Sequence, residues 1–400
     1  MPRGAPEGTG IRSRDKLPHI GLGTKQAMYQ QRVERYVTSA MSKIDRATLA
    51  DIYHVSEYCA EIQQHMQTSE RETQPDPSYM KRQTQVNENV RAILVDWLIN
   101  VHAKFKLLPE TLFLTINLVD RYLSLVVVKK DQVQLVGVAA LLIATKYEEI
   151  YPPTVKDFIY VTKNAFTRKQ ILEMERSMLF SLEFQIQETS SYRFLERYSK
   201  IAKADSVVFL LAQYLLELAL LDSKMNQYPP SLQASAALYV AMRVTFTDEM
   251  QKRGQDQAAT TVSCWTKTLQ EHTRYTSACL KSCAKNYFQL ADLIQKSELN
   301  AILKKFSQSK FLEVSRIICA VINKQNQQAR QSQRESRHLP RESSELNSVD
   351  KTTRGGSSTS KQVCTPSQFG SSAKQMTSKS GVLHQLTSAT NGVSSIESRK

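Results

Sequence analysis

The side chains best suited to hold a metal are six cysteines: Cys59, Cys264, Cys279, Cys283, Cys319 and Cys364. Cys279 and Cys283 are four residues apart, so one turn of a helix would place both thiols on the same face. A zinc site needs a second pair of cysteine or histidine ligands at suitable spacing, and the sequence has no such pair. We therefore expect reduced, free thiols, with no metal and no cofactor.

The chain also lacks the short motifs of common catalytic sites. It contains no G-x-x-x-x-G-K-[ST] loop, no G-x-G-x-x-G, no H-E-x-x-H and neither the H-R-D nor the D-F-G of a protein kinase. Of seven scattered histidines, His102 falls on an apolar helix face, where we expect a hydrogen-bonded core histidine. The sequence predicts no enzyme.

Two charged residues stand in strongly apolar surroundings. Arg91 lies within the apolar stretch that contains Ile93 and Leu94, and Asp120 lies in the largely apolar segment 116–123. A buried charge requires a partner of opposite sign or a full set of hydrogen bonds. Both residues are therefore expected to be structural.

The elements that position these residues are helices. The first extends from Val90 to Phe105 with apolar side chains at i, i+3, i+4 and i+7. A second is expected from Pro109 to about Ser124, and a third over 131–149, apolar nearly all round and therefore central in a bundle.

Thr154 is expected to cap a short fourth helix. Thr167 and Gln170 have the spacing of a capping box that opens a fifth helix, to about Leu182. The pattern then recurs. A helix is expected from about Ser191, followed by the apolar segment 207–221 and a small-residue helix over 234–244; the Pro-Pro pair at 229–230 corresponds to the pair at 152–153. The pattern predicts two helical bundles in tandem.

The two flanks differ from this centre. Residues 1–45 and 325–400 are polar and rich in Gly, Ser or Gln, and both are expected to be mostly disordered. They carry net charges of +4 and +6, so 46–324 keeps only +5 of the total +15. A nearly balanced centre argues against a DNA-reading domain. No apolar run reaches the length of a membrane span, so we expect no membrane partner.

Several segments resemble the landmarks of the cyclin family, in order and at family spacing. These are VRAILVDWL at 90–98, ETL at 110–112, LVDRYLS at 118–124, QLVG at 134–137, ATKYEEIYPP at 144–153, EME at 173–175 and LEF at 182–184. In the second half, RYSKIA at 197–202, LLD at 220–222 and YPPS at 228–231 are similar to B-type, mitotic members. The resemblance covers roughly residues 49–315.

The resemblance implies an all-α fold of two five-helix cyclin boxes after an N-terminal helix. The expected domains are the N-terminal helix and first box at 46–185, the second box at 186–300, a C-terminal extension at 301–324, and the flanks at 1–45 and 325–400. It also implies a regulatory subunit that binds and activates a cyclin-dependent Ser/Thr kinase at the G2/M transition and contributes to substrate choice.

By the same resemblance, individual residues acquire expected roles. Lys146 and Glu175 would grip the C helix of the kinase, with Leu179 and Phe184 adding apolar contact. Arg91 and Asp120 would pair inside the first box. Without the resemblance, Lys146 and Glu175 would count as ordinary solvated charges.

A substrate-docking patch for Arg-x-Leu motifs of substrates or inhibitors is also implied. Its residues are Val90, Ile93, Trp97, Val133 and Gln134, with Asp96 beside them to receive the arginine of the motif. Most of them are equally compatible with the ordinary core of an amphipathic helix. Val90 replaces the usual methionine, and Asn100 stands where A-type members carry an acid, so weaker or altered docking is expected.

The segment RDKLPHIGL at 14–22 resembles the destruction box of mitotic cyclins. Arg14, Leu17, Ile20 and Gly21 fit the motif, and Leu22 replaces its closing asparagine. The motif implies ubiquitination by the anaphase-promoting complex, and the family implies a protein of the nucleus and cytoplasm.

Two other functions remain open at this point. The same double bundle serves DNA-binding transcription initiation factors, and a pure adaptor would bind a partner without activating it. The near-neutral centre and the missing cysteine pairs count against the transcription factor.

Overall fold

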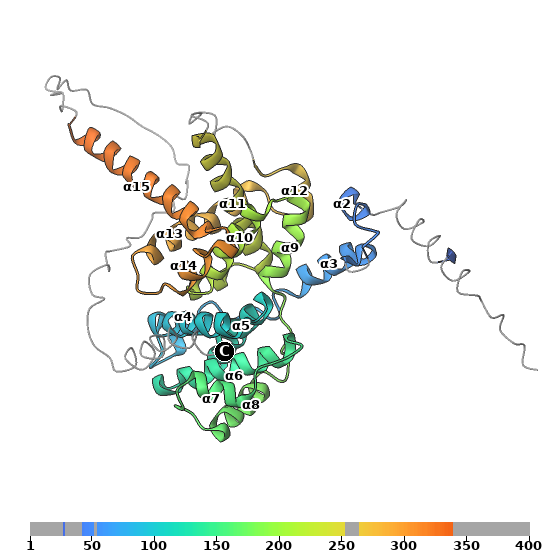
Figure 1. The fold of residues 1–400 in the computed structure, drawn as a ribbon, viewed down its shortest axis with the longest axis vertical. Helices are drawn as coiled ribbons and strands as arrows, with labels where there is room; N and C mark the ends of the chain where they lie inside the picture. The colour runs from blue at the N-terminus through green and yellow to red at the C-terminus, as the bar shows by residue number, and fades with distance from the viewer. Residues whose placement is uncertain (1–26, 29–41, 52–53, 253–263, 339–400) are drawn as a thin grey trace, which may run out of the picture. The chain divides into compact units, whose positions relative to one another are not determined.

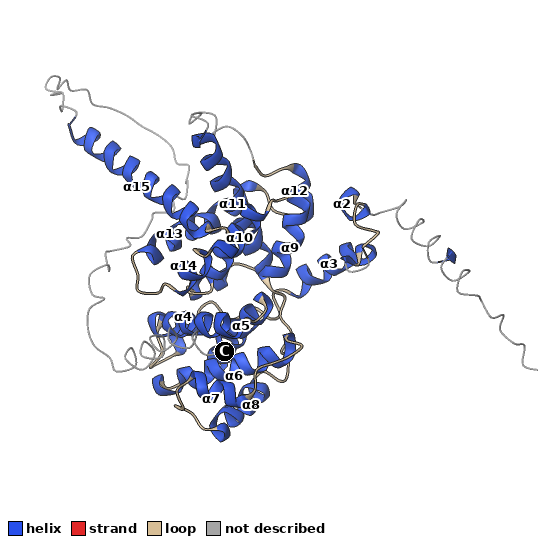
Figure 2. Ribbon diagram, viewed as in Figure 1, coloured by secondary structure: helices blue, strands red, loops and turns tan. Residues whose placement is uncertain are grey.

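The computed structural model describes residues 27–28, 42–51, 54–252 and 264–338, and within these ranges every regular element is a helix (Figures 1 and 2). The chain divides into two compact units, Met1–Thr68 and Ser69–Lys400. The all-α prediction is confirmed.

The described part of the first unit is short. It comprises α2 (Lys43–Arg46), the 3-10 turn η2 (Ser56–Tyr58) and nearly all of α3 (Cys59–Ser69). Ser42 caps α2 by accepting a hydrogen bond from the backbone N–H of Asp45 at 3.2 Å.

The second unit begins with a five-helix bundle: α4 (Glu88–Phe105), α5 (Pro109–Leu125), α6 (Val133–Glu148), α7 (Val155–Val161) and α8 (Arg168–Ser181). Helix α6 packs against the other four, as Figure 1 shows, and its side chains are buried continuously from Leu135 to Thr145. Gly137 lets α4 come close, because a Cβ there would lie 2.8 Å from Leu94 Cδ1.

Local signals explain where these helices begin. Asn87 caps α4 by accepting from Val90 N at 2.9 Å, and Pro109 occupies the first turn of α5. The predicted capping box of α8 is confirmed: Gln170 N donates to Thr167 Oγ1 at 3.3 Å, and Thr167 N donates to Gln170 Oε1 at 2.8 Å.

A second bundle repeats this plan with α9 (Ser191–Ala202), α10 (Ser206–Ala219), α11 (Pro230–Lys252), α12 (Lys267–Thr273) and α13 (Ser277–Gln295). Helix α11 is central here and packs against α9, α10 and α13. Its Ala234, Ala236, Ala237 and Ala241 are fully buried, which lets the neighbouring helices approach.

Two further helices follow the second bundle, α14 (Ala301–Phe306) and α15 (Val314–His338). The buried Val314, Ile318, Val321 and Ile322 dock α15 on the unit. The helix then continues to His338, so the expectation of disorder from residue 325 was wrong for 325–338. Gln, Ala, Arg and Glu are good helix formers, and a docked first half removes the cost of nucleation.

None of the described helices is both long enough and apolar enough to cross a membrane.

Candidate functional site

Lys146 and Glu175 meet where the C-terminal end of α6 packs against α8. Lys146 is in the last turn of α6, Glu175 is in the middle of α8, and Lys146 Nζ lies 2.5 Å from Glu175 Oε1. The Lys146 side chain is 49% exposed and that of Glu175 is 12% exposed. Both groups therefore remain within reach of a partner, and each holds the other in a defined orientation.

Large apolar side chains follow Lys146 and Glu175 in the chain, and several of them were not assigned a role from the sequence. Ile150 and Tyr151, which follow α6, are 86% and 92% exposed. Beyond α8, Phe184 is exposed and meets Phe180 edge to face, with ring centroids 5.4 Å apart. The predicted contact residue Leu179 is half-buried. The signal that the sequence offered was large apolar residues at the ends of predicted helices, as at Ile150 and Tyr151 directly before Pro152 and Pro153.

We call these residues the α6–α8 end surface: Lys146, Ile150, Tyr151, Glu175, Leu179, Phe180 and Phe184. Large exposed apolar residues on the same two helix ends as an ordered ion pair are typical of a protein-binding surface. The ion pair adds orientation, because a partner must satisfy both charges as well as the apolar area.

Among the described residues, no cluster of three or more His, Cys, Asp or Glu side chains suits a metal ion.

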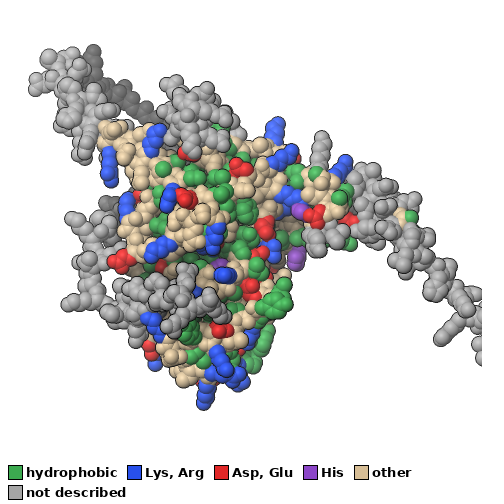
Figure 3. All heavy atoms as spheres, in the orientation of Figure 1, with side chains coloured by type: hydrophobic (Ala, Val, Ile, Leu, Met, Phe, Trp, Pro, Cys, Tyr) green, Lys and Arg blue, Asp and Glu red, His purple; other side chains and the backbone are tan. Residues whose placement is uncertain are grey.

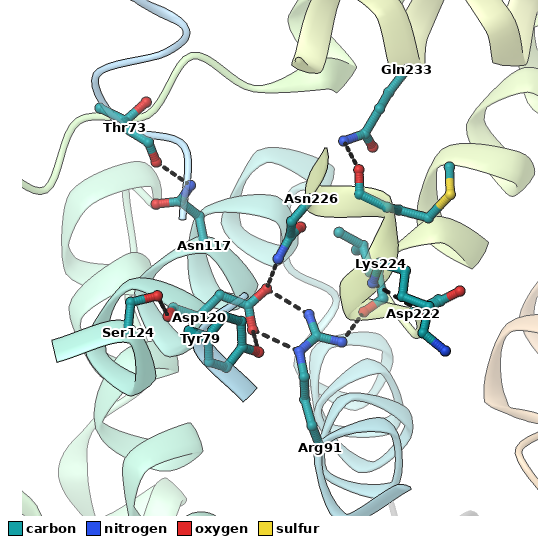
Figure 4. Close-up of polar contacts among 12 residues, drawn as sticks. Thr73, Tyr79, Arg91, Asn117, Asp120, Ser124, Asp222, Lys224, Asn226 and Gln233 are labelled. Carbon is teal, nitrogen blue, oxygen red and sulfur yellow. Dashed lines mark hydrogen bonds and ion pairs between the residues drawn. The ribbon is translucent and has the colours of Figure 1, made fainter. Parts of the chain in front are cut away.

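The structure brings Arg91 and Asp120 together in the interior (Figure 4). Arg91 Nε and one terminal nitrogen each lie 2.6 Å from an Asp120 carboxylate oxygen, and the two side chains are 1% and 2% exposed. Tyr79 donates a third hydrogen bond to Asp120 Oδ1 at 2.7 Å. Asn226 donates a fourth, to Oδ2 at 2.8 Å.

This network also joins the two bundles. The remaining terminal nitrogen of Arg91 donates to the carbonyl of Leu220 at 2.8 Å, and Asn226 comes from the 3-10 turn η5 (Ser223–Gln227). Burial alone lowers the pKa of Arg91, but Asp120 outweighs it and the net pKa is raised. Burial, followed by the Asp120 charge, likewise raises the pKa of Tyr79. The guanidinium therefore stays charged, and the pair fixes the junction of the bundles.

The expected docking patch is only partly accessible. Trp97 and Val133 are each 4% exposed, whereas Val90, Ile93 and Gln134 are half-buried. The accessible part of the patch therefore lies at Val90, Ile93 and Gln134.

Asp96, the expected arginine acceptor, makes a contact with the C-terminal extension. Its Oδ1 accepts a hydrogen bond from the backbone N–H of Ala301 at 2.9 Å, at the start of α14. Burial raises the pKa of this carboxyl group, while the Ala301 hydrogen bond and Lys304 act in the opposite direction. Asp96 thus holds the first residue of α14, a contact 205 positions along the chain that no local pattern indicates, and its role toward the arginine of a docking motif stays a prediction.

A second buried ion pair was missed entirely. Lys305 Nζ on α14 lies 2.7 Å from each carboxylate oxygen of Glu217 on α10, and the two side chains are 10% and 0% exposed. Burial, followed by the charge of Lys305, lowers the pKa of the nearby His102 to about 4. His102 is therefore a neutral core residue, with Nε2 placed 2.8 Å from the carbonyl of Leu108.

The surface charge shows no single-sign stripe on the face drawn in Figure 3, where Lys and Arg are interspersed with Asp and Glu. The destruction-box residues Arg14, Leu17, Ile20 and Gly21 lie outside the described residues.

Comparison with known proteins matches both bundles to one family. The family described as "Cyclin, N-terminal domain" matches residues 61–187, and "Cyclin, C-terminal domain" matches 189–320. A solved viral cyclin from Herpesvirus saimiri is 20% identical, with a TM-score of 0.47 over 57% of this chain and 99% of that one.

Curated relatives agree with this match. The chain is 38% identical to the G2/mitotic-specific cyclin-B of Dictyostelium discoideum, over 70% of this chain and 62% of that protein. It is 39% identical to Cyclin-B2-1 of Oryza sativa subsp. japonica, over 68% of this chain and 61% of that one. It is 38% identical to the G2/mitotic-specific cyclin cdc13 of Schizosaccharomyces pombe, over 72% of this chain and 56% of that protein. The matches thus span somewhat less than two thirds of these relatives, and the chain belongs to the cyclin family.

Proposed function

We propose that this protein is a regulatory subunit that binds and activates a cyclin-dependent Ser/Thr kinase at the G2/M transition. The observation that carries the proposal is the α6–α8 end surface, which combines the ordered Lys146–Glu175 pair with exposed apolar side chains. The names of the relatives, G2/mitotic-specific and B-type cyclins, support the stage of the cell cycle.

Activation of this kind needs no catalytic group in the cyclin. In protein kinases, the position of the C helix decides whether the catalytic lysine meets its glutamate partner. A rigid apolar surface with an ordered ion pair can hold that helix in one position and thereby shift the kinase toward its active state. We therefore assign the phosphoryl transfer to the kinase and the selection of its active conformation to this chain.

We further propose a contribution to substrate choice through Val90, Ile93 and Gln134, the accessible part of the docking patch. An Arg-x-Leu motif would place its leucine on these residues. Asp96 contacts α14, and residue 100 is an asparagine, so the arginine of the motif gains little here and docking is weak.

Turnover and location complete the proposal. Arg14 and Leu17 in the N-terminal segment would present the protein to the anaphase-promoting complex, and the kinase complex would act in the nucleus and cytoplasm. Arginine offers a planar fork of donors to acidic receptor groups, and leucine fills an apolar pocket.

The kinase-binding proposal is tested by removing the ion pair. Lys146→Ala with Glu175→Ala should weaken the affinity for a cyclin-dependent kinase catalytic subunit by about tenfold or more, because a desolvated interfacial charge pair is lost. Isothermal titration calorimetry with the purified kinase measures this.

The matched control is Lys169→Ala with Glu173→Ala, which removes the same two charges from an exposed pair that includes α8 residues only. This control should bind like the wild type. An equal loss of affinity in both double variants, or no loss in the first, would show that Lys146 and Glu175 are not part of the interface.

A further inference from the structure

The connection between α5 and α6 has the geometry of a short β-strand. Val126, with φ −120° and ψ 132°, and Lys129, with φ −73° and ψ 149°, both have extended backbone. Exposure alternates along the connection: Leu125 and Val127 are 64% and 59% exposed and Lys129 is exposed, whereas Val128 is 6% exposed. One face of residues 125–129 is therefore open to solvent.

The side chain of Gln83 holds one edge of this strand as the peptide unit of a neighbouring strand would. Its Nε2 donates to the carbonyl of Val126 at 2.7 Å, and its Oε1 accepts from the backbone N–H of Val128 at 3.0 Å. Gln83 is itself buried and also donates to the carbonyl of Leu123 at 2.7 Å. The extended backbone is therefore fixed in place, and this edge is satisfied.

The opposite edge is free. The N–H and C=O of Val127 and the N–H of Lys129 have no hydrogen-bond partner among the described residues. They point away from Gln83, because successive residues of an extended strand direct their backbone groups to opposite sides. A fixed, extended backbone with unpaired groups is a template to which another strand can pair.

The charges beside this edge indicate which strand fits it. Lys129 has no ion-pair partner within the described part of the chain. Arg82 adds a second cation, since one terminal nitrogen donates to the carbonyl of Ser124 at 2.9 Å while the other pairs with Asp76 at 2.8 Å. A lysine on an open edge opposes indiscriminate pairing. A strand that places Asp or Glu opposite Lys129 turns this obstacle into an attraction.

A second copy of this chain does not supply such an acid. Antiparallel pairing of two copies about Val127 would place each Lys129 opposite a Leu125, and a lysine held against an apolar side chain loses water without gaining a partner. The edge is therefore better suited to a different protein.

We propose that residues 125–129 are a docking edge for an extended segment of a partner protein, which pairs with Val127 as an antiparallel β-strand and places Asp or Glu opposite Lys129. Apolar side chains of that segment would cover Leu125 and Val127. The antiparallel direction is assigned because it is slightly more stable per residue. The edge shares no residue with the α6–α8 end surface or with the docking patch, and its binding requires no kinase.

The probe is a fluorescein-labelled peptide with blocked ends, Asp-Thr-Val-Thr-Leu, whose first, third and fifth side chains match Lys129, Val127 and Leu125 in an antiparallel pairing. Fluorescence anisotropy measures its binding to the full chain, up to about 0.5 mM protein because so short a strand binds weakly. Methylation of the central valine nitrogen removes the N–H that would meet the Val127 carbonyl and keeps every side chain. This change should weaken binding by about tenfold or more, because main-chain hydrogen bonds provide most of the affinity in strand addition.

Variants of the chain test the side chains of the edge. Leu125→Ser should weaken binding about threefold. Leu293→Ser, which changes a leucine that is 63% exposed on α13, is the matched control and should bind like the wild type. Lys129→Glu should weaken binding of this peptide about fivefold and should favour the peptide Lys-Thr-Val-Thr-Leu instead. All three residues are exposed, so the circular dichroism spectrum should not change.

Sedimentation velocity of the chain alone tests the other occupant. A dimer that Leu125→Ser dissociates would assign the edge to a second copy and overturn the proposal. The absence of saturable binding, or equal binding of the methylated peptide, would also overturn it. So would unchanged binding in Leu125→Ser, or a Lys129→Glu variant that still prefers the acidic peptide.

Discussion

Asp120 is the most heavily engaged side chain in the first bundle. It accepts two hydrogen bonds from Arg91, one from Tyr79 and one from Asn226, all between 2.6 and 2.8 Å. Because Asn226 and the carbonyl of Leu220 belong to the second bundle, this carboxylate fixes both the interior of the first bundle and its junction with the second.

Removing Asp120 should therefore destabilise the protein severely. Asp120→Ala leaves the Arg91 guanidinium buried without its partner, which typically costs about 3–5 kcal/mol in the free energy of unfolding. Urea denaturation followed by circular dichroism measures this. Asp131→Ala removes an exposed acid and should change the free energy of unfolding by less than about 0.5 kcal/mol. Similar values for the two variants would show that the Arg91–Asp120 pair contributes little.

The sequence was sufficient to predict the residues that differ in character from their neighbours in the chain. A charge amid apolar neighbours, as at Arg91 and Asp120, is visible in the chain itself. The roles of Asp96, Glu217 and Lys305 were not predictable, since each depends on where α14 docks, and Asp96 and Ala301 are 205 positions apart.

Helix α14 connects the two bundles although it is short. Asp96 of α4 accepts the backbone N–H at its first residue, and Lys305 in its last turn pairs with Glu217 of α10. Phe306 packs edge to face on Tyr214 of α10, with ring centroids 5.5 Å apart. The C-terminal extension is thus part of the folded unit.

Lys305 should be essential to this docking. Lys305→Ala leaves the fully buried Glu217 carboxylate without its cation and should lower the free energy of unfolding by about 3–5 kcal/mol. Its exposed neighbour Lys304 is the matched control, and Lys304→Ala should change the stability by less than about 1 kcal/mol. Chemical denaturation compares the two. If Lys305→Ala unfolds at the wild-type midpoint, α14 is not held by this pair.

The helices themselves were well predicted where periodicity and caps coincide. Pro109, Thr154 and Thr167 mark the starts of α5, α7 and α8 as expected, because Pro suits a first turn and Thr caps exposed N–H groups. The end of α15 was mispredicted, because polar composition suggested disorder where an apolar first half anchors a polar extension.

The proposed binding surface and the contacts that support it lie in different parts of the molecule. The first bundle carries the α6–α8 end surface, while the Arg91–Asp120 network and α14 hold the second bundle against it. The proposed hold on a kinase helix requires such a rigid support.

Turnover of the whole chain should depend on its N-terminal segment. Arg14→Ala with Leu17→Ala should lengthen the half-life at mitotic exit several-fold, because the receptor loses both the forked donor and the apolar anchor. A chase in cycling extract measures this. Ile11→Ala with Arg12→Ala, a neighbouring pair outside the motif, should decay like the wild type. Identical half-lives for all three would leave no destruction box at 14–22.

The central claim is activation of a kinase by a chain that has no catalysis of its own. The most direct measurement is the rate at which a purified cyclin-dependent kinase phosphorylates histone, with and without this protein, alongside the protein alone. We predict that the chain raises the rate by more than about tenfold, that the Lys146→Ala, Glu175→Ala double variant raises it far less, and that the chain alone transfers no phosphate. Phosphorylation by the chain alone would contradict the account. So would binding of the chain to the kinase without a change in the phosphorylation rate.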